Sequence, residues 1–274
     1  MTLPLIGPTR IPALGLGTYR LAGAEAERIV AAALAEGYRH IDTAQAYGNE
    51  AEVGAALARA SVPRDEVFLV TKIMPDRFAP AEFRRAAEES LRRLGTDSVD
   101  LLLLHWPSRE VPIAETMGAM NALIRDGLVR HGGVSNFTVA QVEEARAALD
   151  APLAVNQVEF HPFIDQSRLL AHLERVGVPF AAYSPLARGK VLDEPVLREV
   201  GAAHGVGPVE ATLAWILSKP DAIAIPKTAS PERLAANLAA ATLRLGEDEI
   251  ARIDALASPE GRLIAPEGLA PAWD

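Results

Sequence analysis

Short apolar phrases alternate strictly with amphipathic helical patterns, and this alternation constrains the fold more than any other feature. Strand-like phrases are predicted at residues 13–17, 39–43, 67–73, 99–106, 129–135, 154–160, 180–185 and 223–227. Helical patterns follow them at 24–36, 49–60, 79–94, 112–126, 139–149, 166–176, 195–204 with 209–218, and 231–240. Such alternation indicates a parallel sheet with helices outside it.

Eight strand–helix units in 274 residues match the size of a (β/α)8 barrel, with an open doubly wound sheet as the alternative. Glycines just past several helical patterns agree with helix ends, as at Gly37, Gly95 and Gly177. We therefore predict one α/β domain over residues 1–274, folded as a TIM barrel. Residues 259–274, with three prolines and two glycines, are predicted to form a C-terminal loop near the active site.

Composition excludes several functions. The net charge is −9 with no basic block, so nucleic-acid and anionic-membrane partners are not expected. Cysteine is absent, which removes disulfides and thiolate catalysis. The six histidines lack metal-ligand spacing, so no metal site is expected. Without a signal-peptide pattern or a long apolar run, the expected location is the cytoplasm.

Reactive side chains stand at the ends of the predicted strands, where catalytic groups of a barrel lie. Asp42, Lys72 and His105 each interrupt or end an apolar phrase, and Tyr47 follows Asp42 by five positions. A charge in such a place costs several kcal/mol or shifts its pKa unless it is paired. Taken singly, these residues have ordinary alternatives: a helix cap, a solvated strand end, a surface aromatic or a core histidine.

Together these four types suit reduction of a carbonyl group. A phenol has a pKa of about 10 and is a poor acid unless a nearby cation stabilises its phenolate. Lys72 would supply that cation, Asp42 would hold Lys72 charged, and His105 would donate a hydrogen bond to the carbonyl oxygen. Tyr47 would then act as the general acid. The missing partner is a hydride donor, which indicates a nicotinamide cofactor.

The cofactor is not expected on a Rossmann motif, because residues 15–20 carry Arg20 where the third glycine of G-x-G-x-x-G belongs. A better phosphate site is the end of the eighth predicted strand, just before a helix. There Lys227, Thr228 and Arg233 supply two cations and a hydroxyl. This set suits the 2′-phosphate of NADPH.

These segments resemble the signature motifs of the aldo-keto reductases. The matching stretches are G-Y-R-H-I-D-T-A at 37–44, Y-G-N-E at 47–50, V-S-N-F at 134–137 and I-P-K-T at 225–228. Further matches lie at 104–107, 156–159 and 183–186, so the resemblance covers essentially the whole chain. It implies a (β/α)8 barrel that binds NADPH (NADP+) and a catalytic tetrad of Asp42, Tyr47, Lys72 and His105.

The resemblance also implies cofactor contacts along the strand ends. Ser135, Asn136 and Gln157 would hold the carboxamide, Tyr183 would stack on the nicotinamide, and Asn237 would reach the adenine. Ala236 stands where many family members have a Glu that contacts adenine. The remaining implied contacts are Gly17 and Thr18 at the mouth, Ser184, Pro185, Leu186, Gly189 and Lys190 at the pyrophosphate, and Ile225, Pro226, Lys227, Thr228 and Arg233 at the 2′-phosphate end.

The short loops and the C-terminal residues 262–274 are similar to the bacterial 2,5-diketo-gluconate reductase B and methylglyoxal reductase branch. This implies a small-molecule carbonyl substrate, such as an aldehyde, ketone or α-dicarbonyl, an aromatic substrate wall of Tyr19, Trp106 and Trp273, and a monomer. Two other functions stay open from the residues. One is an aldolase that uses Lys72 as a Schiff-base nucleophile, and the other is a cofactor-sensing regulatory subunit on the same barrel.

Overall fold

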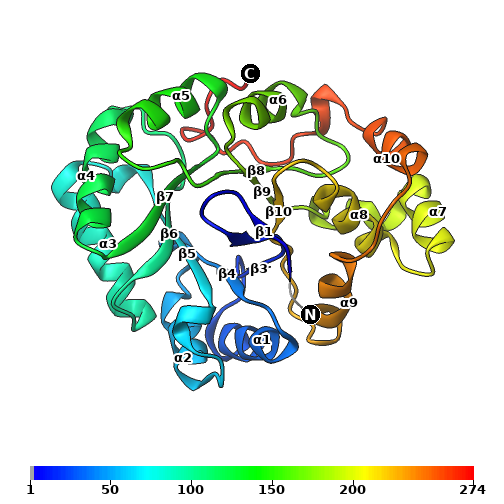
Figure 1. Cartoon of the computed structure of the whole chain (residues 1–274), viewed down its shortest axis with the longest axis horizontal. Coiled ribbons are helices and arrows are strands. Elements are labelled where there is room, and N and C mark those ends of the chain that lie inside the picture. Colours follow the sequence, from blue (N-terminus) through cyan, green and yellow to red (C-terminus); the bar gives the residue numbers. More distant parts are fainter. Residues whose placement is uncertain (1–2) are drawn as a thin grey trace.

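A computed structural model describes residues 3–274 and contains an eight-stranded parallel sheet ringed by helices (Figure 1). Hydrogen-bonded neighbours follow chain order throughout the sheet. The strands are β3 (Leu16–Gly17), β4 (His40–Asp42), β5 (Phe68–Ile73), β6 (Val99–Leu104), β7 (Val129–Ser135), β8 (Asn156–Glu159), β9 (Phe180–Tyr183) and β10 (Ala222–Ala224). Each predicted phrase contains its strand, except that β10 begins one residue earlier than predicted.

The first and last strands meet, which closes the sheet into a barrel. Leu14 forms a parallel bridge with Ala224. The amide of Ala224 donates to the carbonyl of Ala13 over 2.8 Å, and that of Gly15 donates to the carbonyl of Ala224 over 2.9 Å. A side chain at Gly17 would meet the carbonyl oxygen of Ile225 at 2.7 Å, so this close approach requires glycine. The predicted (β/α)8 barrel is confirmed, and the open doubly wound sheet is excluded.

Helices cover the outside of the barrel, as Figure 1 shows. Left-handed glycines at Gly37, Gly95 and Gly177 end three of them, as their positions after the helical patterns predict. The helices are α1 (Gly23–Glu36), α2 (Glu50–Arg59), α3 (Pro80–Leu94), α4 (Ile113–Arg125), α5 (Val139–Ala148), α6 (Ser167–Val176), α7 (Pro195–Ala203), α8 (Pro208–Leu217) and α9 (Glu232–Ala240).

The sequence patterns did not reveal one hairpin and one helix. Strands β1 (Leu5–Ile6) and β2 (Ile11–Pro12) form a hairpin whose two-residue strands are too short to show a period. Helix α10 (Glu247–Asp254) is mostly charged and buries only Ile253, so it has no apolar stripe to recognise. No helix in residues 3–274 is both long and apolar enough to cross a membrane.

The barrel interior is apolar below its polar mouth. Ile11 of the hairpin packs with Val70, Leu101, Ile223 and other buried residues inside the sheet. A larger apolar layer fills the space between the strands and the helices. The apolar interior therefore stabilises the strands, and the polar side chains lie at the carboxyl ends of those strands.

Substitution of Gly54 tests the packing of α2 against α3. A methyl group at Gly54 of α2 would lie 2.4 Å from the carbonyl oxygen of Leu94, whereas one at Gly118 of α4 meets nothing within 4 Å. We expect Gly54→Ala to lower the free energy of unfolding by about 1–3 kcal/mol through overpacking. Gly118→Ala should raise it by roughly 0.5–1 kcal/mol, because alanine favours a helix. Urea unfolding measures both, and equal effects would contradict the close contact between α2 and α3.

Candidate active site

A buried ion pair lies at the carboxyl ends of β4 and β5. Lys72 Nζ donates to Asp42 Oδ1 over 2.5 Å, and both side chains are at least 98% buried. Lys72 also donates to the carbonyl of Thr43 over 2.9 Å. Gln157 of β8 donates its amide N–H to the other oxygen of Asp42 over 2.8 Å. Both charges are therefore paired and hydrogen-bonded, which a buried pair requires.

Lys72 stays charged in this setting. Burial by itself lowers the pKa of Lys72, but the charge of Asp42, the proximity of Tyr47 and the hydrogen bonds to both raise it by more. The resulting pKa lies above the ordinary value for lysine. A Schiff-base nucleophile needs a neutral amine. This environment therefore argues against the aldolase alternative.

Tyr47 is the third member of this chain of polar contacts. It ends the 3-10 helix η1 (Gln45–Tyr47), and Lys72 Nζ lies 3.2 Å from its hydroxyl oxygen. Burial raises the pKa of Tyr47, and the charge of Lys72 and its hydrogen bond lower that pKa by less. The net direction is upward, so the predicted lowering by Lys72 is present but smaller than the effect of burial. Tyr47 is a protonated phenol at neutral pH.

Asn49 and Glu50, which follow Tyr47, fix the loop that carries it. Neither residue was assigned a role from the sequence. Asn49 donates to the carbonyls of Thr18 and Leu21, each over 2.9 Å, and accepts from the hydroxyl of Thr43. The buried carboxylate of Glu50 accepts from Thr71 and Arg93. The polar run Y-G-N-E, which follows the buried strand β4 by a few residues, was the signal for these contacts.

His105 follows β6 and faces the phenol. Its ring centroid lies 5.8 Å from that of Tyr47, with the rings nearly perpendicular. Burial, followed by the charge of Lys72, lowers the pKa of His105 to about 3. Its Nδ1 is buried and has no hydrogen-bond partner in residues 3–274. The imidazole is therefore neutral, and the single N–H of a neutral ring is favoured on Nε2, where an acceptor can reach it.

The predicted carboxamide residues come together beside this cluster. Tyr183 donates its hydroxyl to Asn136 Oδ1 over 2.7 Å, and the amide of Asn136 donates to the carbonyl of His105 over 3.0 Å. Ser135 donates to the carbonyl of Gln157 over 2.8 Å. Asn136 has a left-handed backbone, with φ of 65°. These contacts join the ends of β6, β7, β8 and β9.

The predicted pyrophosphate segment forms a tight turn after β9. Ser184, Ala187, Arg188 and Gly189 have positive φ, and Gly189 faces open space where a side chain would project. Pro185 is buried, Leu186 is half-buried, and Lys190 is exposed in the 3-10 segment η4 (Ala187–Asp193). Within this turn the amide of Ala187 donates to the carbonyl of Ser184 over 2.9 Å, and that of Gly189 donates to the carbonyl of Leu186 over 2.8 Å.

Of the predicted 2′-phosphate residues, Lys227 and Thr228 lie between β10 and α9, and Arg233 lies in the first turn of α9. Lys227 and Arg233 are exposed, and neither makes an ion pair within the described residues. The hydroxyl of Thr228 accepts from the amide of Ser230 over 3.1 Å and lies 3.3 Å from its carbonyl. Gly17, Thr18, Ile225, Pro226 and Asn237 are buried alongside. Gly17 N–H donates to the carbonyl of Pro226 over 3.0 Å, which joins the mouth to this segment.

The three aromatic residues predicted for substrate form two groups, Tyr19 beside Tyr47 and Trp106 with Trp273. Tyr19 is 52% exposed, and its ring centroid lies 5.1 Å from that of Tyr47. Trp106 packs against Trp273 of the C-terminal segment with 6.3 Å between centroids. The guanidinium of Arg262 covers Trp273 at 3.6 Å. The C-terminal segment therefore contacts the residue directly after His105.

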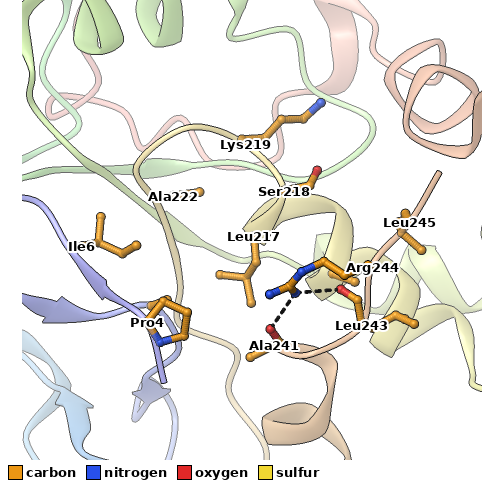
Figure 2. Close-up of a pocket in the computed structure, with 12 residues that line it drawn as sticks. Pro4, Ile6, Leu217, Ser218, Lys219, Ala222, Ala241, Leu243, Arg244 and Leu245 are labelled. Carbon is orange, nitrogen blue, oxygen red and sulfur yellow. Dashed lines mark hydrogen bonds between the residues drawn. The ribbon is translucent and has the colours of Figure 1, made fainter. Parts of the chain in front are cut away.

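A cavity of about 360 Å³ lies elsewhere in the molecule (Figure 2). It adjoins the hairpin, the start of β10 and the C-terminal end of α8, which places it at the opposite end of the barrel. Figure 2 shows that Arg244, its largest cation, donates to the carbonyls of Ala241 and Leu243. The cavity contains none of the reactive side chains described above.

A closed barrel with a phenol, an amine, a carboxylate and an imidazole at the carboxyl ends of its strands belongs to the barrel enzymes. The model of the Aldo/keto reductase family matches residues 13–258. The chain belongs to the aldo-keto reductase family. It is accordingly an oxidoreductase that reduces carbonyl groups, in a family that generally uses NAD(P)H.

Named relatives agree over nearly the whole chain. The methylglyoxal reductase DkgB of Escherichia coli O157:H7 is 41% identical over 96% of this chain and 99% of its own. The morphine 6-dehydrogenase of Pseudomonas putida is 37% identical over 90% and 88%. A crystal structure provisionally assigned as a 2,5-diketo-D-gluconic acid reductase B is 47% identical, with a TM-score of 0.97 over 100% of this chain and 98% of its own.

The low pKa of His105 predicts how kcat/KM for carbonyl reduction changes as the pH falls. Its pKa is lowered from 6.5 to about 3, so the neutral, donating imidazole persists as the pH falls through the ordinary histidine range. We expect kcat/KM for carbonyl reduction to vary less than about twofold between about pH 5 and 7.5. Steady-state rates at saturating cofactor measure this. An inflection near pH 6.5 that disappears in His105→Gln would contradict it.

Proposed function

We propose that the protein is an NADPH-dependent reductase of small aldehydes and α-dicarbonyls, with Tyr47 as the general acid. The observation that carries this proposal is the chain of contacts from Asp42 through Lys72 to the hydroxyl of Tyr47, over 2.5 Å and 3.2 Å. It provides a protonated phenol beside a permanent cation. Those are the groups that a carbonyl oxygen needs as it gains negative charge.

Each member has a distinct task in this proposal. The carbonyl oxygen of the substrate accepts hydrogen bonds from the hydroxyl of Tyr47 and from Nε2 of His105. As negative charge develops on that oxygen, Tyr47 transfers its proton. Lys72 then stabilises the phenolate that remains, and Asp42 keeps Lys72 oriented. Gln157 holds the second oxygen of Asp42, so it contributes through the ion pair as well as at the cofactor.

The residues present fit a nicotinamide cofactor. NADPH, when bound, supplies the hydride. Ser135, Asn136 and Tyr183 form a hydrogen-bonded group at the strand ends beside His105. Residues 184–190 provide the turn for the pyrophosphate. Lys227 and Arg233 are exposed cations without an ion-pair partner in the described chain, as a 2′-phosphate requires.

The substrate class follows from the named relatives. Two of them are named for methylglyoxal and diketo-gluconate reduction, and Tyr19 of the predicted aromatic wall lies beside Tyr47. We infer a small polar dicarbonyl as the preferred substrate. A regulatory role without catalysis is disfavoured, because all four tetrad residues are present and in contact range.

Replacement of Tyr47 tests the general acid. Tyr47→Phe keeps the ring and removes only the hydroxyl that Lys72 contacts. We expect kcat for methylglyoxal reduction to fall at least about 100-fold, as for loss of a general acid. The Kd for NADPH, measured by fluorescence titration, should stay within about threefold, since no predicted cofactor contact is removed.

A matched control is Tyr19→Phe, which removes a hydroxyl from the neighbouring exposed ring. Its kcat should remain close to that of the wild type. If Tyr47→Phe retains wild-type turnover, Tyr47 is not the acid. A large loss of NADPH affinity in that variant would place Tyr47 in cofactor binding instead.

The 2′-phosphate site is tested by the double variant Lys227→Ala/Arg233→Ala. A charged hydrogen bond contributes about 1.5–3 kcal/mol, so the NADPH Kd should rise by roughly 10-fold or more. The NADH Kd should change by less than about twofold, because NADH lacks that phosphate. Arg125→Ala, on the outside of α4, is the control for net charge. Equal increases for the two cofactors would refute this role for Lys227 and Arg233.

A further inference from the structure

Glu159 is a buried carboxylate that the proposed reaction does not use. It is the last residue of β8, two positions after Gln157, and its side chain is fully buried. Its Oε1 accepts from the amide of Leu263 over 2.8 Å, and its Oε2 accepts from the amide of Ile264 over 3.0 Å. His161 lies 3.1 Å from Oε1, and Arg262 lies 3.8 Å from Oε2. Three of these four partners are consecutive residues of the C-terminal segment.

The segment 262–274 has few other anchors. Before it, Gly261 is packed so closely that a methyl group there would overlap the carbonyl of Phe163. Beyond Ile264, the backbone is held where Arg109 donates to the carbonyl of Ala270 over 3.1 Å. At its end, the carboxylate of Asp274 accepts from the amide of Val139 over 2.8 Å, beside α5, where Figure 1 places the C-terminus. The last two anchors are on the surface, whereas Glu159 is in the interior.

The same segment packs against the residue that follows His105. Arg262 covers Trp273, and Trp273 packs on Trp106, which follows His105. Glu159 and Arg262 also act on Tyr183. Burial raises the pKa of Tyr183, the charge of Glu159 raises it further, and that of Arg262 lowers it. The position of the segment therefore sets where Trp273 lies in the aromatic wall. It also sets where the charge of Arg262 lies relative to Tyr183, the residue predicted to stack on the nicotinamide.

We propose that Glu159 is a positioning residue that fastens the C-terminal segment to β8, and so sets the aromatic wall that larger carbonyl substrates contact. This inference rests on the proposed reductase function. A carboxylate is suited to the task because it accepts two backbone N–H groups and pairs with Arg262 at once. A glutamine has one acceptor oxygen and would direct its NH2 group against the second N–H. We expect a three-carbon substrate to reach the tetrad without contact with the aromatic wall, and an aryl aldehyde to pack against it.

The test compares wild type, Glu159→Gln and the control Glu267→Gln in the full chain. Glu267 is an exposed glutamate of the same segment. In Glu159→Gln we expect amide hydrogen exchange over residues 262–274 to accelerate about 10-fold, as for loss of a charged hydrogen bond, with β8 and β9 unchanged. KM for 4-nitrobenzaldehyde should rise about 10-fold, whereas kcat for methylglyoxal should stay within about twofold. Glu267→Gln should change none of these.

Unchanged exchange in a folded Glu159→Gln variant would overturn the proposal. So would an unchanged KM for the aryl aldehyde, or an equal loss of kcat for both substrates, which would place Glu159 in the chemistry. If Glu159→Gln does not fold, Ile264→Pro removes one of the two N–H donors and leaves the carboxylate in place. It should raise the same KM, and an unchanged KM would overturn the proposal. Failure of the wild type to oxidise NADPH with either aldehyde would instead refute the proposed function.

Discussion

The buried ion pair of Lys72 and Asp42 is the interaction on which the arrangement of the site depends. Removing one partner of such a pair leaves an uncompensated buried charge and costs about 3–5 kcal/mol. Two further hydrogen bonds hold the pair in the barrel: Lys72 donates to the carbonyl of Thr43, and Gln157 donates its amide N–H to Asp42. Its positive end then points at the hydroxyl of Tyr47. Asp42 keeps Lys72 charged although burial opposes its charge, and the charged Lys72 makes the half-buried phenol of Tyr47 a usable acid.

Two features of the barrel place the other groups of the site around this ion pair. Its interior is apolar, so the polar groups concentrate at the carboxyl ends of the strands. Its loops come from many strands, so separate segments supply the acid, the donor and the cofactor contacts. Asn49 and Glu50 hold the loop of Tyr47, and Glu159 holds the C-terminal segment. These three residues connect the rigid sheet to the parts of the site that lie on loops.

Much of this could be predicted from the sequence, because the strand–helix alternation is regular and the reactive residues interrupt apolar phrases. The barrel and the clustering of Asp42, Tyr47, Lys72 and His105 follow from that pattern. The hairpin and α10 could not be predicted, since neither has a period long enough to recognise. The partners of Glu159 could not be predicted either, because a contact across 104 residues depends on where the tail crosses the barrel. The sequence also could not show that burial outweighs the charge of Lys72 in its effect on the pKa of Tyr47.

The most direct measurement is the single-turnover rate of hydride transfer in Asp42→Asn/Lys72→Met. This double variant removes the ion pair without leaving an unpaired buried charge. With NADPH bound and methylglyoxal added, the rate should fall at least about 100-fold while Tyr47 and His105 remain, because the phenolate loses its cation. The Kd for NADPH should stay within about threefold. A single-turnover rate equal to that of the wild type would contradict the central role of the ion pair.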